Sequence, residues 1–154
     1  MLYALLCYND EKTVWSWSKE EEDACMARIG AVQEKLARAG KLGPVARLMP
    51  TTTATTLRKD QDPPLVIDGP FAETKEQLLG FYIVDCVDLD DAVGVAKELG
   101  KASPGGAYEI RPLAVFRPDE ARVDVSSETP SGASAFAKAS ADLGDLSSEA
   151  PSGA

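Results

Sequence analysis

Apolar residues recur along the first 117 positions at two different spacings, which predict two kinds of element. One long segment has an apolar residue at every third or fourth position, the spacing of one helix face. These residues are Cys25, Ile29, Val32 and Leu36. Ser18 and Glu21 form a capping-box pattern before them, and Gly40 follows them. We therefore expect a helix that begins after Ser18 and ends at Gly40.

A second amphipathic segment follows Asp88, a residue type that is favourable at a helix N-cap. Its apolar positions again have helical spacing and are Ala92, Val95, Ala96 and Leu99. Gly100 comes directly after them, and glycine commonly ends a helix. A second helix is therefore expected between Asp88 and Gly100.

Five segments are rich in β-branched, aromatic or other apolar residues and predict strands. They are residues 2–8, a stretch within 44–59 that Pro50 interrupts, 64–67, 81–87 and 107–116. The complete order is then β-α-β-β-β-α-β. This order predicts an α+β fold with a ferredoxin-like antiparallel sheet and two helices on one face.

Two helices cover only one face of such a sheet, yet residues 2–8 offer apolar side chains to both faces. Tyr3 and Leu5 would point to one face, while Leu2 and Leu6 would point to the other. An uncovered apolar sheet face is typical of an interface. We therefore expect a homodimer that packs sheet against sheet.

The composition changes near Pro118. Residues 1–118 hold nearly all of the large apolar side chains, whereas 119–154 are mainly Ser, Ala, Gly, Pro and acidic residues. The second segment repeats itself, since VSSETPSGA at 125–133 returns as LSSEAPSGA at 146–154. Such a segment buries too little apolar surface to offset the entropy that ordering would remove. We predict one folded domain, residues 1–118, and a low-complexity tail, residues 119–154.

The chain carries 25 acidic and 16 basic side chains, which gives a net charge of −9. This balance disfavours nucleic acid and anionic membranes as partners, because both attract clusters of Lys and Arg. No apolar run reaches the ~20 residues of a membrane span, and MLYALLCYND lacks the basic leader of a signal peptide. Cys7, Cys25 and Cys86 are far apart and are expected to be reduced thiols. We expect a cytoplasmic protein.

Histidine is absent from the sequence, which removes Ser-His and Cys-His nucleophile pairs and every His-based metal motif. Proton transfer would therefore depend on Asp, Glu, Tyr, Lys or Cys side chains. The spacing of the remaining residues indicates neither a metal site nor a cofactor, and we expect none.

The most specific motif lies between two predicted strands. DGPFAETKEQL occupies residues 68–78, and GFY follows at 80–82. Together with ATTLR at 54–58 and EIRP at 109–112, this motif closely resembles the DGPF subgroup of the YCII-related family. The resemblance covers roughly residues 1–117 and excludes the predicted tail.

This resemblance implies a dimeric α/β-barrel built from ferredoxin-like subunits. Members of the subgroup are mostly uncharacterised, and in bacteria they are often linked with extracytoplasmic-function sigma factors. Some YCII-related relatives are thought to be enzymes that use a His-Asp pair. The present chain departs from that pair, because it contains no histidine.

Asp68 is the leading candidate for chemistry, and two interpretations of it are open. Asp-Gly and Gly-Pro are turn signals, so the carboxylate of Asp68 could simply bind backbone amides in the turn. Alternatively, Asp68 lies at a strand end that faces a pocket, where partial burial would suit its carboxyl group to acid-base chemistry. Both interpretations can hold together. Phe71 would then pack over the same site, or belong to the core.

Arg111 lies inside an otherwise apolar strand, and a buried guanidinium requires a carboxylate partner. Asp68, Glu109 or the carboxylate of a ligand would serve. Thr55 belongs to a threonine-rich segment that either lines a polar pocket or simply favours a strand. Tyrosines near the site would supply phenolic donors, and the candidates for this role are Tyr3 and Tyr82.

Two shorter segments also have alternatives. Thr74 and Gln77 have the spacing of a capped helical turn, whose amides would either be capped internally or receive an anion. Trp15 and Trp17 precede the first long helix and are expected to cover the edge of the core rather than stack on a ligand.

Two functions from different classes fit these residues. The first is a small-ligand-binding or regulatory domain without turnover, whose ligand would be a small anion. The second is a cofactor-independent lyase or isomerase, in which Asp68 moves a proton on a small oxygenated acid. Arg111 would hold the carboxylate of that substrate.

Overall fold

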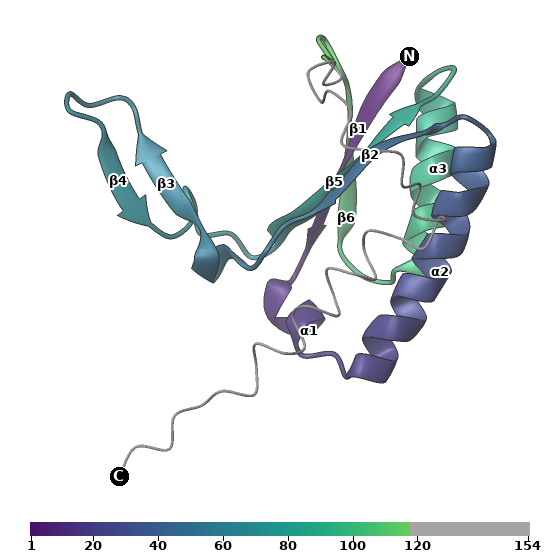
Figure 1. The fold of residues 1–154 in the computed structure, drawn as a ribbon, viewed down its shortest axis with the longest axis horizontal. Helices are drawn as coiled ribbons and strands as arrows, with labels where there is room; N and C mark the ends of the chain where they lie inside the picture. Colours follow the sequence, from purple (N-terminus) through teal and green to yellow (C-terminus); the bar gives the residue numbers. More distant parts are fainter. Residues whose placement is uncertain (118–154) are drawn as a thin grey trace, which may run out of the picture. The chain divides into compact units, whose positions relative to one another are not determined.

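The computed structural model describes residues 1–117 of the chain. Four strands form one sheet in the order β2-β5-β1-β6, and each neighbouring pair is antiparallel (Figure 1). These strands are β1 (Leu2–Asn9), β2 (Leu42–Arg47), β5 (Gln77–Asp85) and β6 (Ala107–Pro112). The predicted α+β class with a ferredoxin-like sheet is confirmed. The predicted tail, residues 119–154, lies outside the described residues, so the domain boundary stays a prediction.

Helices α2 (Lys19–Arg38) and α3 (Leu89–Ala102) lie together on one side of this sheet (Figure 1). The hydroxyl of Ser18 accepts a hydrogen bond from the Glu21 amide, and the Glu21 carboxylate accepts one from the Ser18 amide. This capping box begins α2 where the sequence predicted it. Asp88 begins α3 in a similar way, because its carboxylate accepts a hydrogen bond from the Asp91 amide at 2.9 Å.

The main core lies between the four-stranded sheet and the two long helices. Alternate residues of β1 and β5 point to the helices because side chains alternate between the faces of a strand. The buried members are Tyr3, Leu5, Leu36, Tyr82, Val84, Cys86, Ala92, Val95, Ala96 and Leu99. Burying a large apolar side chain contributes about 1.5–3 kcal/mol. This cluster is therefore the main stabilising feature of the domain.

The opposite face of the sheet carries Leu6 beside Phe81 and Ala4 beside Ile83. Ala4 and Ile83 are buried, whereas Leu6 and Phe81 are partly exposed. The apolar character that the sequence predicted for this face is therefore present. Packing of the face against a second copy of the chain stays a prediction.

Strands β3 (Thr55–Arg58) and β4 (Leu65–Asp68) pair only with each other and form a separate two-stranded sheet. We call residues 55–68 the arm. Figure 1 shows the arm standing apart from the four-stranded sheet. A 3₁₀ turn, Thr51–Thr53, leads into the arm and follows Pro50, the residue that interrupts the β-rich stretch. Strand β4 was predicted, whereas the stretch within 44–59 that was predicted as one strand forms both β2 and β3. The separation of the arm from the main sheet was not predicted.

Two local differences from the predicted elements occur beside the arm. The short helix α1 (Glu11–Trp15) was not predicted, and Asp10 caps it by accepting a hydrogen bond from the Lys12 amide. Residues 74–77 do not form the expected helical turn, because β5 already begins at Gln77. Within residues 1–117, no helix combines the length and apolar character that crossing a membrane requires.

Candidate functional site

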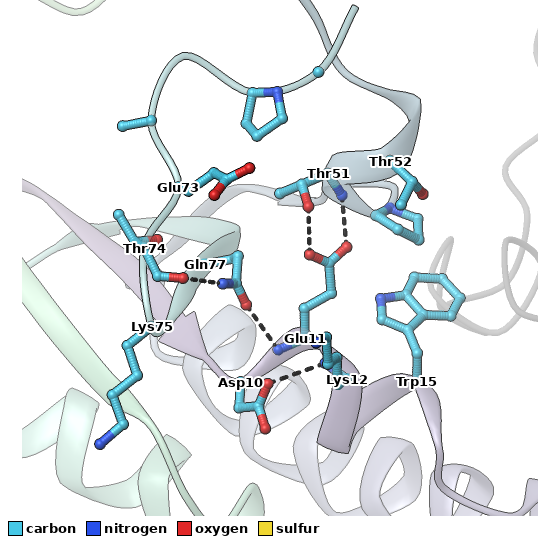
Figure 2. A pocket seen from close by; sticks show the side chains of 14 residues that line it. Asp10, Glu11, Lys12, Trp15, Thr51, Thr52, Glu73, Thr74, Lys75 and Gln77 are labelled. Carbon is cyan, nitrogen blue, oxygen red and sulfur yellow. Dashed lines mark hydrogen bonds between the residues drawn. The ribbon is translucent and has the colours of Figure 1, made fainter.

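A cavity of about 800 Å³ opens between α1, the 3₁₀ turn and the segment that follows the arm (Figure 2). Its walls are formed by residues within 10–15, 50–52 and 69–77. This volume lies in the range of ~300–1,000 Å³ that is typical of sites for small molecules. Each wall contributes polar side chains, and Trp15 adds an aromatic surface.

Glu11 connects the three walls of the cavity. Its carboxylate accepts hydrogen bonds from the amide nitrogen of Thr51 at 2.5 Å and from Thr51 Oγ1 at 2.6 Å. Its own amide donates to Gln77 Oε1 at 3.0 Å, and Gln77 Nε2 donates to the carbonyl of Thr74 at 2.5 Å. Figure 2 shows this chain of bonds running from the 3₁₀ turn to the segment after the arm. The walls are therefore fixed relative to one another before any ligand binds.

Charged side chains of both signs line the cavity. The hydroxyl of Thr13 and the amide of Lys12 donate hydrogen bonds to Asp10, and they hold the pKa of that carboxyl below its ordinary value. Asp10 is therefore an anion at neutral pH and is already engaged by the protein. Lys12 and Lys75 supply exposed cations, and Glu73 supplies an exposed carboxylate. Among residues 1–117, no three acidic or Cys side chains gather as a metal site would require.

Trp15 forms part of the cavity wall, although we expected it to cover the edge of the core. The guanidinium carbon of Arg47 lies 5.2 Å from the centroid of the Trp15 ring, within the range of a cation–π contact. Arg47 Nη1 also binds Glu22 Oε1 at 2.8 Å, which ties this contact to α2. Arg47 thereby fixes the position of the indole beside the cavity.

Asp68 lies at the end of β4 and is exposed, opposite Thr55 in the register of the arm. The next two residues, Gly69 and Pro70, line the cavity, whereas the side chains of Asp68 and Thr55 do not. Gly69 has φ of 107°, a conformation that side chains disfavour, and its amide donates to the carbonyl of Ala54 at 2.7 Å. The Asp-Gly-Pro motif thus closes the base of the arm and leads the chain into the cavity wall.

The other predicted ligand-binding residues do not line the cavity. Phe71 is 77% exposed, and the guanidinium carbon of Arg58 lies 5.6 Å from its ring centroid. Arg111 is exposed on β6, where its guanidinium pairs with the carboxylate of Glu109. Of the three partners considered for Arg111, the structure therefore supplies Glu109.

The two tyrosine candidates belong to the core. Tyr3 and Tyr82 are buried on the face of the sheet that the helices cover. Burial raises the pKa of Tyr82 to about 12, so its phenol stays protonated at neutral pH. The residues predicted as one site are thus distributed over the core, the arm and β6.

The sequence pointed to part of the cavity wall, because Thr74, Gln77 and the threonine-rich segment were considered as ligand contacts, but it did not indicate Glu11, which joins the walls. One local signal was available, because Asp10 followed by Thr13 is typical of a capped helix start. No local signal indicated the contact between Glu11 and Thr51, since 40 positions separate them.

The comparisons with known proteins agree with this architecture. The family model described as "YCII-related domain" matches residues 1–117, the whole described part of the chain. The chain belongs to the YCII-related family. It is also 59% identical over 121 residues to "Uncharacterized protein R00369" of Rhizobium meliloti (strain 1021), with 78% of this chain and 98% of that protein covered. The resemblance found in the sequence is thereby confirmed for the YCII-related family. The DGPF subgroup is a finer assignment and stays a prediction.

Proposed function

We propose that this YCII-related protein binds a small oxygenated organic acid, without turnover, in the cavity beside α1. The proposal depends above all on the hydrogen bonds of Glu11, which join all three walls of the cavity. A site whose walls are fixed in advance loses less conformational entropy when a ligand binds. Such preorganisation favours a binding role.

The charge distribution supports an acid as the ligand. The carboxylates of Asp10 and Glu11 already accept hydrogen bonds from protein donors, so they are less available to a ligand. Lys12 and Lys75 remain as exposed cations that can pair with a carboxylate. Thr52 adds a hydroxyl, and Trp15 adds an apolar wall for the carbon skeleton. Binding without turnover also suits the link with extracytoplasmic-function sigma factors that the DGPF resemblance implies.

A ligand screen would test this proposal. Small hydroxy and keto acids would be added to the full chain, with melting temperature and tryptophan fluorescence as readouts. We expect at least one acid to raise the melting temperature of the wild type. Lys75→Met should raise the dissociation constant of that acid about tenfold, which is ~1.4 kcal/mol of binding free energy. Lys97→Met, on the exposed side of α3, is the matched control and should bind normally. Equal affinity in both variants and the wild type would refute this site.

The alternative function is a lyase or isomerase with Asp68 as the acid or base. One observation favours it, because Asp68 directly precedes Gly69 and Pro70 in the cavity wall. The experiment is to incubate each acid that binds with wild type and with Asp68→Asn and to follow its conversion by NMR. Conversion by the wild type alone would support the enzyme. Binding without conversion by either protein would support the binding module.

A further inference from the structure

Trp15 presents an aromatic surface that the core does not use. Its side chain lines the cavity and is 37% exposed. Trp17, two positions further along the chain, packs instead against the buried cluster of Cys25, Ile29 and Ala102. Neither core cluster of residues 1–117 contains Trp15. An indole offers a large apolar surface, so Trp15 keeps part of that surface available to a ligand.

The indole of Trp15 is held in place before any ligand binds. The guanidinium carbon of Arg47 lies 5.2 Å from the centroid of the Trp15 ring, and Arg47 Nη1 binds Glu22 Oε1 at 2.8 Å. A guanidinium over a ring covers one of its two faces, and the indole still contributes to the cavity lining. An aromatic surface that is fixed in advance loses little conformational entropy when a ligand stacks on it.

The cavity has room for more than a very small acid such as lactate. Its volume of about 800 Å³ lies toward the upper end of the ~300–1,000 Å³ that is usual for sites of drug-sized ligands. Beside Trp15, its lining includes Pro50, Pro70 and Ala72. Proline has no amide hydrogen to donate. These parts of the wall therefore suit an apolar group of the ligand.

The aromatic surface and the cation of the proposed acid site belong to different walls. Trp15 is the last residue of α1, whereas Lys75 belongs to the segment that follows the arm. Figure 2 shows the two side chains on opposite sides of the cavity. A ligand that engages both must therefore carry its carboxylate at one end and its apolar group at the other.

We propose that the ligand is a hydroxy or keto acid that carries an aromatic ring, and that this ring stacks on Trp15 while the carboxylate pairs with Lys75. The inference rests on the proposed binding of an acid in this cavity and narrows that acid to one chemical class. Offset-stacked rings attract each other beyond the gain from apolar burial alone. Trp15 thus determines specificity for the ring, and Lys75 recognises the acid.

Phenyllactate and lactate share one head group, so a comparison of the two isolates the contribution of the ring. Calorimetric titration of the full chain would measure both dissociation constants. We expect phenyllactate to bind the wild type at least about tenfold more tightly than lactate, and cyclohexyllactate, whose ring is saturated, to bind more weakly than phenyllactate. Trp15→Leu should remove most of the preference for phenyllactate and leave the affinity for lactate unchanged.

Two further variants separate this role from a general effect on folding. Trp15→Phe keeps an aromatic surface and should keep most of the preference, with circular dichroism confirming that each variant is folded. Trp17→Phe is the matched control and should bind both acids like the wild type. It also leaves Trp15 as the only tryptophan of the chain, so phenyllactate at saturation should change its fluorescence more than lactate does.

The outcomes distinguish this inference from the proposed function. Equal affinity of the wild type for phenyllactate, cyclohexyllactate and lactate would overturn the aromatic class and leave the acid site in place. A preference for phenyllactate that survives in Trp15→Leu would overturn the role of Trp15. If phenyllactate did not bind while another acid of the screen did, only the present inference would fail. If no acid bound at all, the proposed function would fail with it.

Discussion

Glu11 and Thr51 are joined by two hydrogen bonds from one carboxylate, at 2.5 Å to the Thr51 amide nitrogen and 2.6 Å to its Oγ1. Glu11 belongs to α1, and Thr51 begins the 3₁₀ turn that leads into the arm. The pair therefore fixes the cavity wall and the entry of the arm at the same time. Its removal should affect both stability and ligand binding.

Glu11→Ala should lower the free energy of unfolding by about 1–3 kcal/mol, because it leaves the amide and hydroxyl of Thr51 without their charged acceptor. Urea denaturation followed by circular dichroism would measure this difference. Glu73→Ala is the control, because it removes an exposed carboxylate from the same cavity. If both variants lost the same stability, the Glu11–Thr51 pair would have no special role.

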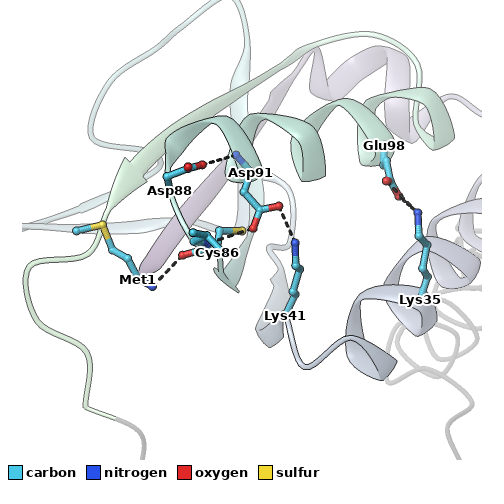
Figure 3. Close-up of polar contacts among 8 residues, drawn as sticks. Met1, Lys35, Lys41, Cys86, Asp88, Asp91 and Glu98 are labelled. Atoms are coloured by element: carbon cyan, nitrogen blue, oxygen red, sulfur yellow. Dashed lines mark hydrogen bonds and ion pairs between the residues drawn. The ribbon is translucent and has the colours of Figure 1, made fainter.

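An ion pair between α3 and the residue before β2 should make stability depend on pH (Figure 3). Lys41 Nζ lies 2.6 Å from Asp91 Oδ1, and the Val87 amide donates to Asp91 Oδ2 at 3.1 Å. These partners hold the pKa of Asp91 below its ordinary value, and Asp91 raises the pKa of Lys41. Both groups are therefore charged in the folded protein at neutral pH.

Asp91→Asn should reduce stability at neutral pH, and this loss should shrink in acid. The carboxyl pKa of Asp91 is lower in the folded protein than in the unfolded chain, where it is about 3.9. The ion pair therefore stabilises the fold fully above that pH, and its contribution is lost as the pH falls through the pKa of the folded protein. Melting curves of both proteins from neutral pH to below about pH 4 would show this convergence. Glu98→Gln is the control, since it breaks the more exposed pair with Lys35. A difference that stayed constant in acid would contradict the assignment.

The three cysteines should be nearly inert in the folded protein. Burial raises the pKa of Cys7 to about 12 and also raises the pKa of Cys86, while Cys25 is buried beside the end of α3. The reactive thiolates of Cys7 and Cys86 are therefore scarce at neutral pH, and burial shields Cys25 from reagents. Titration with a disulfide reagent should be slow for the native chain and fast after denaturation. Rapid reaction of one thiol in the native chain would contradict this packing.

The elements that the sequence predicted best are those with strong local signals. The capping box at Ser18 and the N-cap at Asp88 depend on residues three positions apart, and both helices begin where these caps indicated. The antiparallel sheet followed from the order of elements. Alternation along β1 could also have placed Tyr3 in the core, because it shares a face with Leu5.

The arm and the cavity could not be predicted in the same way. Strand-forming residues in β3 and β4 indicate strands, but they do not say which sheet those strands join. Helix α1 is only five residues long, too short for its periodicity to be recognised. The cavity depends on Glu11 meeting Thr51, a long-range contact that only the folded chain brings together.

Truncation after Pro118 should leave the domain folded. Every buried core residue among residues 1–117 lies between Tyr3 and Ala102, so the core is complete before the predicted tail begins. The truncated chain should melt within a few degrees of the full chain and remain equally soluble. A loss of soluble protein would show that residues beyond 118 contribute to the domain and that the predicted boundary is wrong.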